Sequence, residues 1–204
     1  MLVKIYSENP NPRQVDLVVN TLKAGGVAVF PTDTVYGLGC DIYSHKAAER
    51  VAAIKGTKLE RAEFSFIFSD LSHISDFVKQ IDKNVFKLMK KNLPGPYTFI
   101  LPANQNVPKI FKGKKKTIGI RVPDNPVVLE IVRALGNPLL TTSVHDEDEV
   151  IEYTTDPELI HEKYGDKVDI VVDGGYGSNI ASTVIDCTGE EPVIVREGPS
   201  LPVL

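Results

Sequence analysis

The sequence predicts an α/β fold in which helices pack on a twisted, mixed sheet. Segments with a helical period alternate along the whole chain with short, apolar, β-branched segments, as is typical of α/β proteins. The last two expected strands, 182–187 and 192–196, are separated only by a turn at 189–191, so we expect them to pair as a hairpin. Neither a linker nor a repeat divides the 204 residues, and one domain over 1–204 is the simplest interpretation.

Each expected element has its own signal in the chain. Asn11 is a preferred N-cap and Pro12 a preferred first residue of a helix, which Gly25 ends. Ser44 caps a second helix that runs to Ile54. Further helices are expected at 70–79, 82–92, 126–135 and 156–164. Strands are expected at 3–6, 27–30, 64–68, 97–102, 117–122, 138–142 and 168–172, with loops through Gly39 and around 145–152.

Composition excludes several classes of protein. The net charge of −4 gives no global attraction to nucleic acid or to a membrane surface. Cys40 and Cys187 lie in or beside apolar segments and outside any CxxC pair, so we expect buried free thiols. No apolar run approaches the roughly 18 residues of a membrane span, and a cytoplasmic protein is expected.

The first candidate for chemistry is the loop FPTDTVYGLG at 30–39, which follows a buried strand. Ligands of open α/β sheets bind where strands end in such loops, and its glycines permit a close approach of the backbone. Thr, Asp and Gly are also ordinary turn residues, so a polar turn remains an alternative. The loop is not a P-loop, because no Gly-Lys-Ser or Gly-Lys-Thr follows.

The second candidate combines the lysine run 112–116 with Arg121. The run is the one dense positive segment, and it is either a solvated loop or a contact for RNA phosphates; its lysines are Lys112, Lys114, Lys115 and Lys116. Arg121 lies in the apolar segment IGIRV, and an arginine there needs a partner anion. That anion is either a structural Asp or Glu, or a carboxylate or phosphate of a ligand.

Three more strand ends carry hydroxyl groups or an arginine, namely 141–143, 182–183 and 196. Together they suit a polyanionic ligand held by hydroxyl and guanidinium groups. The four histidines are scattered, and no nucleophile with an adjacent base stands out. The segment His145–Glu149 either attracts a metal ion or forms a solvated acidic loop.

Five collinear segments resemble the Sua5/YciO/YrdC family, and their balance is most like the YciO branch. They are FPTDTVYGLGCD (30–41), PGPYTFIL (94–101), KKTIGIRVPDNP (115–126), PLLTTS (138–143) and STVIDCTGEEPVIVREG (182–198). The resemblance implies a YrdC/RibB-like sheet with a large concave cavity. It also implies synthesis of threonylcarbamoyl-AMP from L-threonine, bicarbonate and ATP, the first step toward the t6A modification of tRNA.

The resemblance further implies roles for particular residues. The threonine side would be lined by Thr32, Tyr36, Arg121, Thr141 and Ser182. The ATP side would be lined by Lys55, Thr117, Ser143 and Arg196, of which Lys55 and Arg196 would serve catalysis. Mg²⁺ would accompany ATP, with no metal ligand from protein side chains. Double-stranded RNA or tRNA binding, or a regulatory role, is the alternative function for such a chain.

Three positions differ from the pattern usual in the family. Its Lys-x-Arg motif is replaced by 55–58, with Lys58 or Arg61 as substitutes for the arginine. Its Ser-x-Asn motif becomes Ser143-Val144-His145. A histidine that usually contacts threonine is replaced by Ile67. These differences favour ligand binding over full synthase activity.

Overall fold

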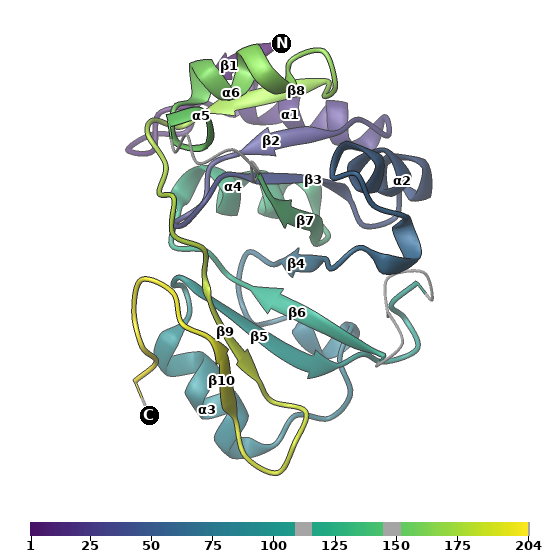
Figure 1. The fold of residues 1–204 in the computed structure, drawn as a ribbon, viewed down its shortest axis with the longest axis vertical. Helices are drawn as coiled ribbons and strands as arrows, with labels where there is room; N and C mark the ends of the chain where they lie inside the picture. The colour runs from purple at the N-terminus through teal and green to yellow at the C-terminus, as the bar shows by residue number, and fades with distance from the viewer. Residues whose placement is uncertain (109–115, 145–151, 204) are drawn as a thin grey trace.

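The computed structural model describes residues 1–108, 116–144 and 152–203, and within these ranges ten strands form one mixed sheet (Figure 1). Their order is β1-β8-β2-β3-β7-β4-β6-β5-β9-β10. The strands are β1 Leu2–Lys4, β2 Ala28–Phe30, β3 Gly37–Asp41, β4 Ser65–Ile67, β5 Tyr97–Pro102, β6 Thr117–Arg121, β7 Leu139–Ser143, β8 Ile170–Asp173, β9 Thr183–Asp186 and β10 Val193–Arg196. The helices are α1 Pro12–Lys23, α2 His45–Ile54, α3 Lys83–Asn92, α4 Pro126–Leu135, α5 Glu152–Thr155 and α6 Pro157–Tyr164, with 3₁₀ turns η1 Leu59–Arg61 and η2 Ile74–Asp76. The predicted α/β class with a mixed sheet is confirmed, as is the antiparallel hairpin of β9 and β10.

Helices cover the two faces of this sheet unequally. On one face, α2, α3 and α6 pack over an apolar core that runs from β8 to β9. On the other face, α1 and α4 pack over the half of the sheet that holds β1, β8, β2 and β7, and this core extends to Ile67 of β4. Among the described residues this second core includes none from β5, β6 or β9, so its helices stop short of that part of the face.

Local capping sets the helices of the second core. In α1, the side chain of Asn11 accepts a hydrogen bond from the backbone N–H of Arg13, at 3.0 Å, and Pro12 occupies the first position. In α4, Asn125 caps in the same way and Gly136, with φ of 84°, ends the helix. The apolar stripe of each helix faces the sheet, and burying one such side chain stabilises the fold by about 1.5–3 kcal/mol.

The loop expected to run through Gly39 is shorter than predicted, because β3 begins at Gly37. This strand pairs antiparallel with both β2 and β7. Glycine is depleted in strands, so the segment has the composition of a loop. Close packing explains the glycines: a Cβ on Gly39 would lie 2.1 Å from the carbonyl oxygen of Leu140, and one on Gly37 would lie 2.5 Å from the ring of Phe30.

The helix predicted at 70–79 is wrong, since only the short turn η2 is helical there. Asp70 accepts a hydrogen bond from the N–H of Ser72 at 2.7 Å, which forms a turn, and Val78 bridges to Ala103 as an isolated strand pair. The opening strand, expected at 3–6, lies at Leu2–Lys4. Helix α5 begins at Glu152, where a loop was expected; the rest of that predicted loop, 145–151, lies outside the described residues.

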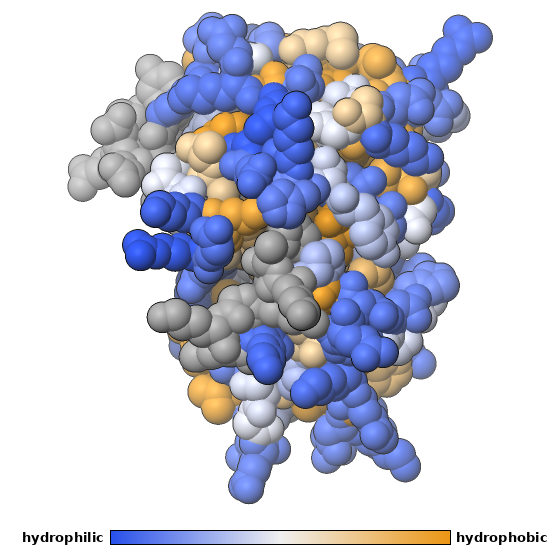
Figure 2. All heavy atoms as spheres, turned by 90° about the vertical axis from the view of Figure 1, so that its right-hand side faces the viewer, coloured by the Kyte–Doolittle hydropathy of each residue, from blue (hydrophilic) through white to orange (hydrophobic). Residues whose placement is uncertain are grey.

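The surface and the thiols agree with the composition. Hydrophilic residues cover most of the face seen in Figure 2, with apolar residues in small areas between them. Cys40 and Cys187 are buried and free, as predicted. In the described ranges no helix has the length and apolar character needed to cross a bilayer. The domain boundaries 1–204 stay a prediction.

Candidate functional site

The part of the sheet face that α1 and α4 leave open carries small and hydroxyl-bearing residues. Successive residues of a strand point to opposite faces. In β6 the apolar residues Ile118 and Ile120 lie in the core under α2 and α3, so Thr117, Gly119 and Arg121 share the open face. The register places Ser65 of β4 between Gly119 of β6 and Thr141 of β7. We call this row, with Thr98 and Ser182 beyond it, the polar floor.

Gly119 lies at the centre of the polar floor. A Cβ at this position would lie 2.9 Å from the hydroxyl of Ser65 and 3.0 Å from the methyl group of Thr98. These two side chains therefore flank the bare backbone of β6 from the neighbouring strands β4 and β5. A glycine is therefore needed here, because any side chain would collide with its neighbours from β4 and β5.

Arg121 is fixed through one nitrogen of its guanidinium group. Its Nη2 donates to Asp33 Oδ1 at 3.1 Å and to Thr34 Oγ1 at 2.8 Å. Both members of the ion pair are buried, with side chains only 7% and 9% exposed. The buried Nε–H of Arg121 has no acceptor within the described ranges. Of the two alternatives for the partner of Arg121, the structural acid is therefore present, and a contact of Arg121 with a ligand stays a prediction.

A second cation, Arg196, acts electrostatically on the ion pair of Arg121 and Asp33. Burial lowers the pKa of Arg121; the carboxylate of Asp33 opposes this effect, and the positive charge of Arg196 adds to it. Burial also raises the pKa of Asp33, against the opposing attraction of Arg121. Arg121 and Arg196 are thus close enough to repel each other, and Asp33 offsets only part of that positive charge.

The residues predicted for the threonine side divide into two kinds. Thr32 is buried in the 31–36 loop, where its hydroxyl donates to the carbonyl of Val35 at 2.8 Å. Tyr36 is fully buried in the core of the opposite face; its hydroxyl donates to Gly175 O at 2.6 Å and accepts from Gly174 N at 3.2 Å, and burial raises its pKa. Both hydroxyl groups therefore stabilise loops through hydrogen bonds to their backbone. A direct contact of either with a ligand stays a prediction.

Thr141, Ser182 and Arg121 lie on the polar floor itself. Among the described residues, the hydroxyl of Thr141 makes only long hydrogen bonds, of 3.5 and 3.4 Å, to backbone carbonyls. The hydroxyl of Ser182 lies 2.8 Å from that of Thr98. Ser182 also holds Arg196, whose Nε and Nη2 donate to its carbonyl oxygen at 3.1 and 2.8 Å.

The residues predicted for ATP approach the polar floor from both sides. Lys55, the C-cap of α2, donates from Nζ to the carbonyl oxygen of Ser143 at 3.0 Å, and burial lowers its pKa. Thr117 and the side chain of Ser143 are half-buried at the ends of their strands. Lys55 contacts β7, whereas Arg196 belongs to β10, which is separated from β7 in the sheet order by β4, β6, β5 and β9. A ligand that contacts both cations must therefore extend across several strands of the sheet.

Several residues predicted for the site lie outside the described residues or away from the polar floor. Lys112, Lys114 and Lys115, together with the segment His145–Glu149, lie outside the described residues. Lys116 is exposed at the start of β6, with φ of 52°. Ile67, which stands in place of the family's histidine, is fully buried in the core under α1 and α4.

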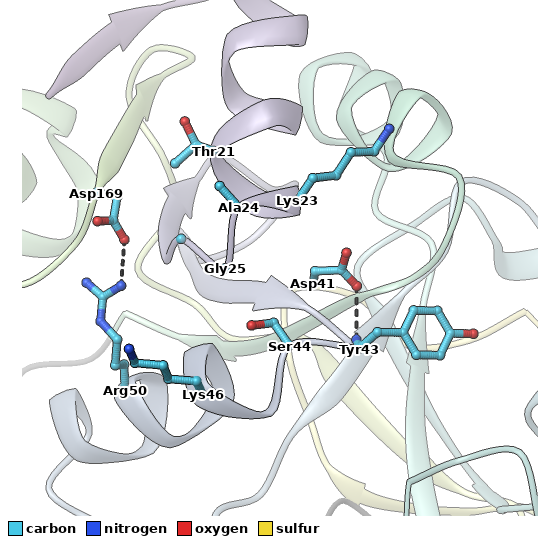
Figure 3. Close-up of a pocket in the computed structure, with 11 residues that line it drawn as sticks. Thr21, Lys23, Ala24, Gly25, Asp41, Tyr43, Ser44, Lys46, Arg50 and Asp169 are labelled. Carbon is cyan, nitrogen blue, oxygen red and sulfur yellow. Dashed lines mark hydrogen bonds and ion pairs between the residues drawn. The ribbon is translucent and has the colours of Figure 1, made fainter.

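A cavity of about 810 Å³ lies away from the polar floor, between the end of α1 and the start of α2 (Figure 3). Both carboxylates in its lining are already engaged. Asp41 accepts from the N–H of Tyr43 at 2.9 Å, and Asp169 pairs with Arg50 at 2.8 Å. The large concave cavity that the resemblance implies belongs at the polar floor, and there it stays a prediction.

Sequence reasoning missed three contributors to this site. Asp33 was noticed only as a carboxylate in the 30–39 loop, although a lone acid among buried residues needs a cation. Ser65 and Thr98 are single hydroxyl-bearing residues inside the otherwise apolar strands FSFIF and YTFIL. That isolation is the signal that could have identified them, because a hydroxyl group in an apolar strand needs a polar neighbour.

The fold is that of the mixed α/β proteins with a YrdC-type sheet, one face of which is left partly open and polar. The chain belongs to the Sua5/YciO/YrdC family, whose sequence profile, described as "Telomere recombination", matches residues 20–198.

Relatives of two kinds support this assignment. The chain is 41% identical to the protein YciO of Escherichia coli over 196 residues, which is 95% of this chain and 93% of YciO. The crystal structure of E. coli YciO superimposes with a TM-score of 0.89 over 98% of this chain and 96% of that one. Identity to a threonylcarbamoyl-AMP synthase of Marinobacter nauticus is 31%, over 91% and 97% of the two chains.

A more distant solved structure matches the fold as well. It is P. abyssi Sua5 complexed with L-threonine, with a TM-score of 0.87 and 25% identity. The match covers 97% of this chain but only 57% of that longer protein.

Proposed function

We propose that this protein forms threonylcarbamoyl-AMP from L-threonine, bicarbonate and ATP, with pyrophosphate and water as the other products. Membership of a family that includes threonylcarbamoyl-AMP synthases supports the reaction class. The threonine complex of the structural relative P. abyssi Sua5 supports the amino-acid substrate. The proposed role would place the protein in tRNA modification.

One observation carries the proposal: three cations border a floor of hydroxyl groups with too few acids to neutralise them. Arg121 lies on the polar floor, and Arg196 and Lys55 lie beside it. Of these three cations, only Arg121 has a carboxylate partner within the described ranges, namely Asp33. A site of this kind favours a ligand that brings its own negative charge, as ATP and an amino acid both do.

The proposed reaction asks for little acid–base chemistry. The threonine amino group attacks the carbon of bicarbonate with loss of water, and an oxygen of the resulting carbamate attacks the α-phosphorus. The bond from that phosphorus to pyrophosphate then breaks. Such a step depends on alignment and on cations that stabilise the developing charge. In this proposal Arg121 binds the carboxylate of threonine, while Lys55 and Arg196 bind the phosphates.

Mg²⁺ enters this proposal as the counter-ion of ATP. Among the residues that the structure describes, no group of three His, Cys, Asp or Glu side chains is arranged to hold a metal ion. When bound with ATP, the ion would neutralise phosphate charge.

The test is chromatography of the purified protein incubated with Mg-ATP, bicarbonate and ¹⁴C-labelled L-threonine, without tRNA. We expect a labelled adenylate and an equal amount of pyrophosphate. Both should vanish when threonine or bicarbonate is omitted, and the Arg196→Ala variant should form far less. Pyrophosphate release that does not depend on threonine would overturn the proposed substrate, and a lack of any ATP turnover would overturn the reaction class.

The differences from the family pattern can be tested in the same assay. Lys58 and Arg61 are both exposed on the segment that follows Lys55. Replacing each by Gln shows whether either substitutes for the arginine of the Lys-x-Arg motif. The RNA-binding alternative stays a prediction, because most of its lysine run lies outside the described residues.

A further inference from the structure

Asp33 is a buried carboxylate with two specific partners. Its Oδ1 accepts from Arg121 at the end of β6, and its Oδ2 accepts from the N–H of Asp124 at 2.9 Å. The neighbouring turn is joined to the same loop, because the side-chain amide of Asn125 reaches Thr32 O at 3.4 Å. One side chain thus links the loop after β2, the end of β6 and the turn that starts α4.

These contacts fix the guanidinium of Arg121 at one nitrogen. Nη2 donates both to Asp33 and to Thr34, whereas the buried Nε–H has no acceptor in the described part of the chain. Buried donors are nearly always satisfied in folded proteins, so this unsatisfied donor is a candidate for a contact with a ligand oxygen. The protein therefore orients this side chain and leaves a donor for a ligand oxygen.

The charge balance shows why this orientation depends on Asp33. Arg196 lies close enough to disfavour the charge on Arg121, and Asp33 is the carboxylate that opposes it. Without that carboxylate two guanidinium groups would repel each other, and Arg121 would keep only the neutral hydroxyl of Thr34 as a fixed partner.

We propose that Asp33 is the positioning residue of the amino-acid subsite: it holds Arg121 in the orientation that receives the carboxylate of the substrate, without touching the substrate itself. This inference rests on the proposed function, since it assigns the carboxylate of L-threonine to Arg121. Asp33 acts only through Arg121, so its replacement should change the binding of the amino-acid substrate and not that of ATP.

The test compares Asp33→Asn with a matched control, Asp169→Asn. Asp169 also joins an arginine to a backbone amide, with Arg50 at 2.8 Å and the N–H of Val27 at 2.7 Å, but it lines the cavity away from the polar floor. L-Threonine affinity is measured by calorimetry, with and without Mg-ATP, and KM is measured separately for threonine and ATP. Melting temperature is recorded for every variant.

We expect Asp33→Asn to weaken threonine affinity by about tenfold or more, the scale of a hydrogen-bonded charged pair, while the KM for ATP changes less than about twofold. Asp169→Asn should lower the melting temperature and leave both affinities unchanged. If Asp33→Asn folds poorly, Thr34→Val removes the other acceptor of Nη2 and should weaken threonine binding in the same direction.

Two failures can be told apart. If the wild-type protein does not bind L-threonine, the proposed function fails, and the role of Asp33 fails with it. If the wild-type protein binds threonine and Asp33→Asn binds it equally well per folded molecule, the proposed function stands. Asp33 is then a structural ion-pair partner only.

Discussion

The carbonyl oxygen of Ser182 accepts two hydrogen bonds from the guanidinium of Arg196, one from Nε and one from Nη2. The hydroxyl of the same serine lies within hydrogen-bond distance of Thr98 and also receives Nη2 of Arg196 at 3.3 Å. Ser182, which is expected to contact threonine, therefore holds by hydrogen bonds Arg196, which is expected to contact ATP. The two proposed subsites meet at this residue.

Arg196→Ala should weaken Mg-ATP binding strongly, because it removes a cation that has no acidic partner in the described ranges. A loss of about 1.5–3 kcal/mol is expected for a hydrogen bond to a charged group, and titration calorimetry measures it. Ser182→Ala is the matched control, because it keeps the carbonyl that orients Arg196 and should reduce ATP affinity much less. Equal ATP binding by the wild type and Arg196→Ala would contradict the assigned role.

Arg121→Lys should impair both stability and threonine binding. The planar guanidinium places Nη2 between Asp33 and Thr34, and a lysine side chain of different length and shape does not bring its ammonium group to the same point, so the melting temperature should fall. Threonine affinity of the folded fraction should fall by about 1–3 kcal/mol. Arg133→Lys, at an exposed pair with Glu130, is the control. A fall in melting temperature with unchanged threonine affinity would leave Arg121 a purely structural role.

If Lys55 binds the phosphates as proposed, ATP binding should have a characteristic dependence on pH. Burial lowers the pKa of this amine, so between the lowered and the ordinary pKa the folded protein binds fewer protons than the unfolded chain. The contribution of Lys55 to stability therefore rises with pH across that window. ATP binding favours the charged amine, so ATP affinity should fall as pH rises through the same window.

Calorimetry with Mg-ATP from pH 7 to pH 10 tests this prediction. Lys55→Arg should flatten the profile, because arginine stays charged throughout. Lys58→Arg, at an exposed position three residues away, should leave it unchanged. A profile that is the same in Lys55→Arg and in the wild type would show that Lys55 does not contact the phosphates.

Gly39→Ala should destabilise the fold by about 3 kcal/mol, because the added Cβ would lie 2.1 Å from the backbone oxygen of Leu140, which cannot move without disturbing β7. Gly189→Ala, where the nearest atom would be 3.8 Å away, should change stability by less than about 0.5 kcal/mol. Urea unfolding measures both. Similar midpoints for the two variants would mean that β3 and β7 can separate at little cost.

The two thiols should be inert in the folded protein. Burial raises the pKa of Cys40 and of Cys187 to about 12, so at pH 8 roughly one thiol in ten thousand is a thiolate. A disulfide reagent such as DTNB should react with neither under native conditions and with both in guanidinium chloride. Rapid labelling of Cys40 in the native protein would contradict its burial.

Sequence patterns were sufficient for the class of fold and for most elements. Caps such as Asn11 and Asn125 are local signals, and the hairpin of β9 and β10 follows from a short turn. The helix expected at 70–79 failed because Ile74, Phe77 and Val78 have helical spacing, although they are buried by a 3₁₀ turn and a bridge to Ala103.

For the candidate site, the residue types could be predicted but not their partners. Arg121 was identifiable as an arginine in an apolar strand. Its pairing with Asp33 joins residues 88 positions apart, and no local pattern encodes such a pair. Tyr36 was expected among ligand contacts. Its hydroxyl instead meets the backbone of Gly174 and Gly175, a contact that only the packing of β3 beside the 174–177 loop creates.

β10 lies at the edge of the sheet, all four of its residues are exposed, and among the described strands it pairs only with β9. Such a strand can detach while the core under α2 and α6 stays folded, since little apolar area is lost when it leaves. Arg196 would leave with it. The proposed binding of nucleotide would then be lost on warming before the main unfolding transition, and a nucleotide bound by Arg196 would slow hydrogen exchange in this hairpin above all.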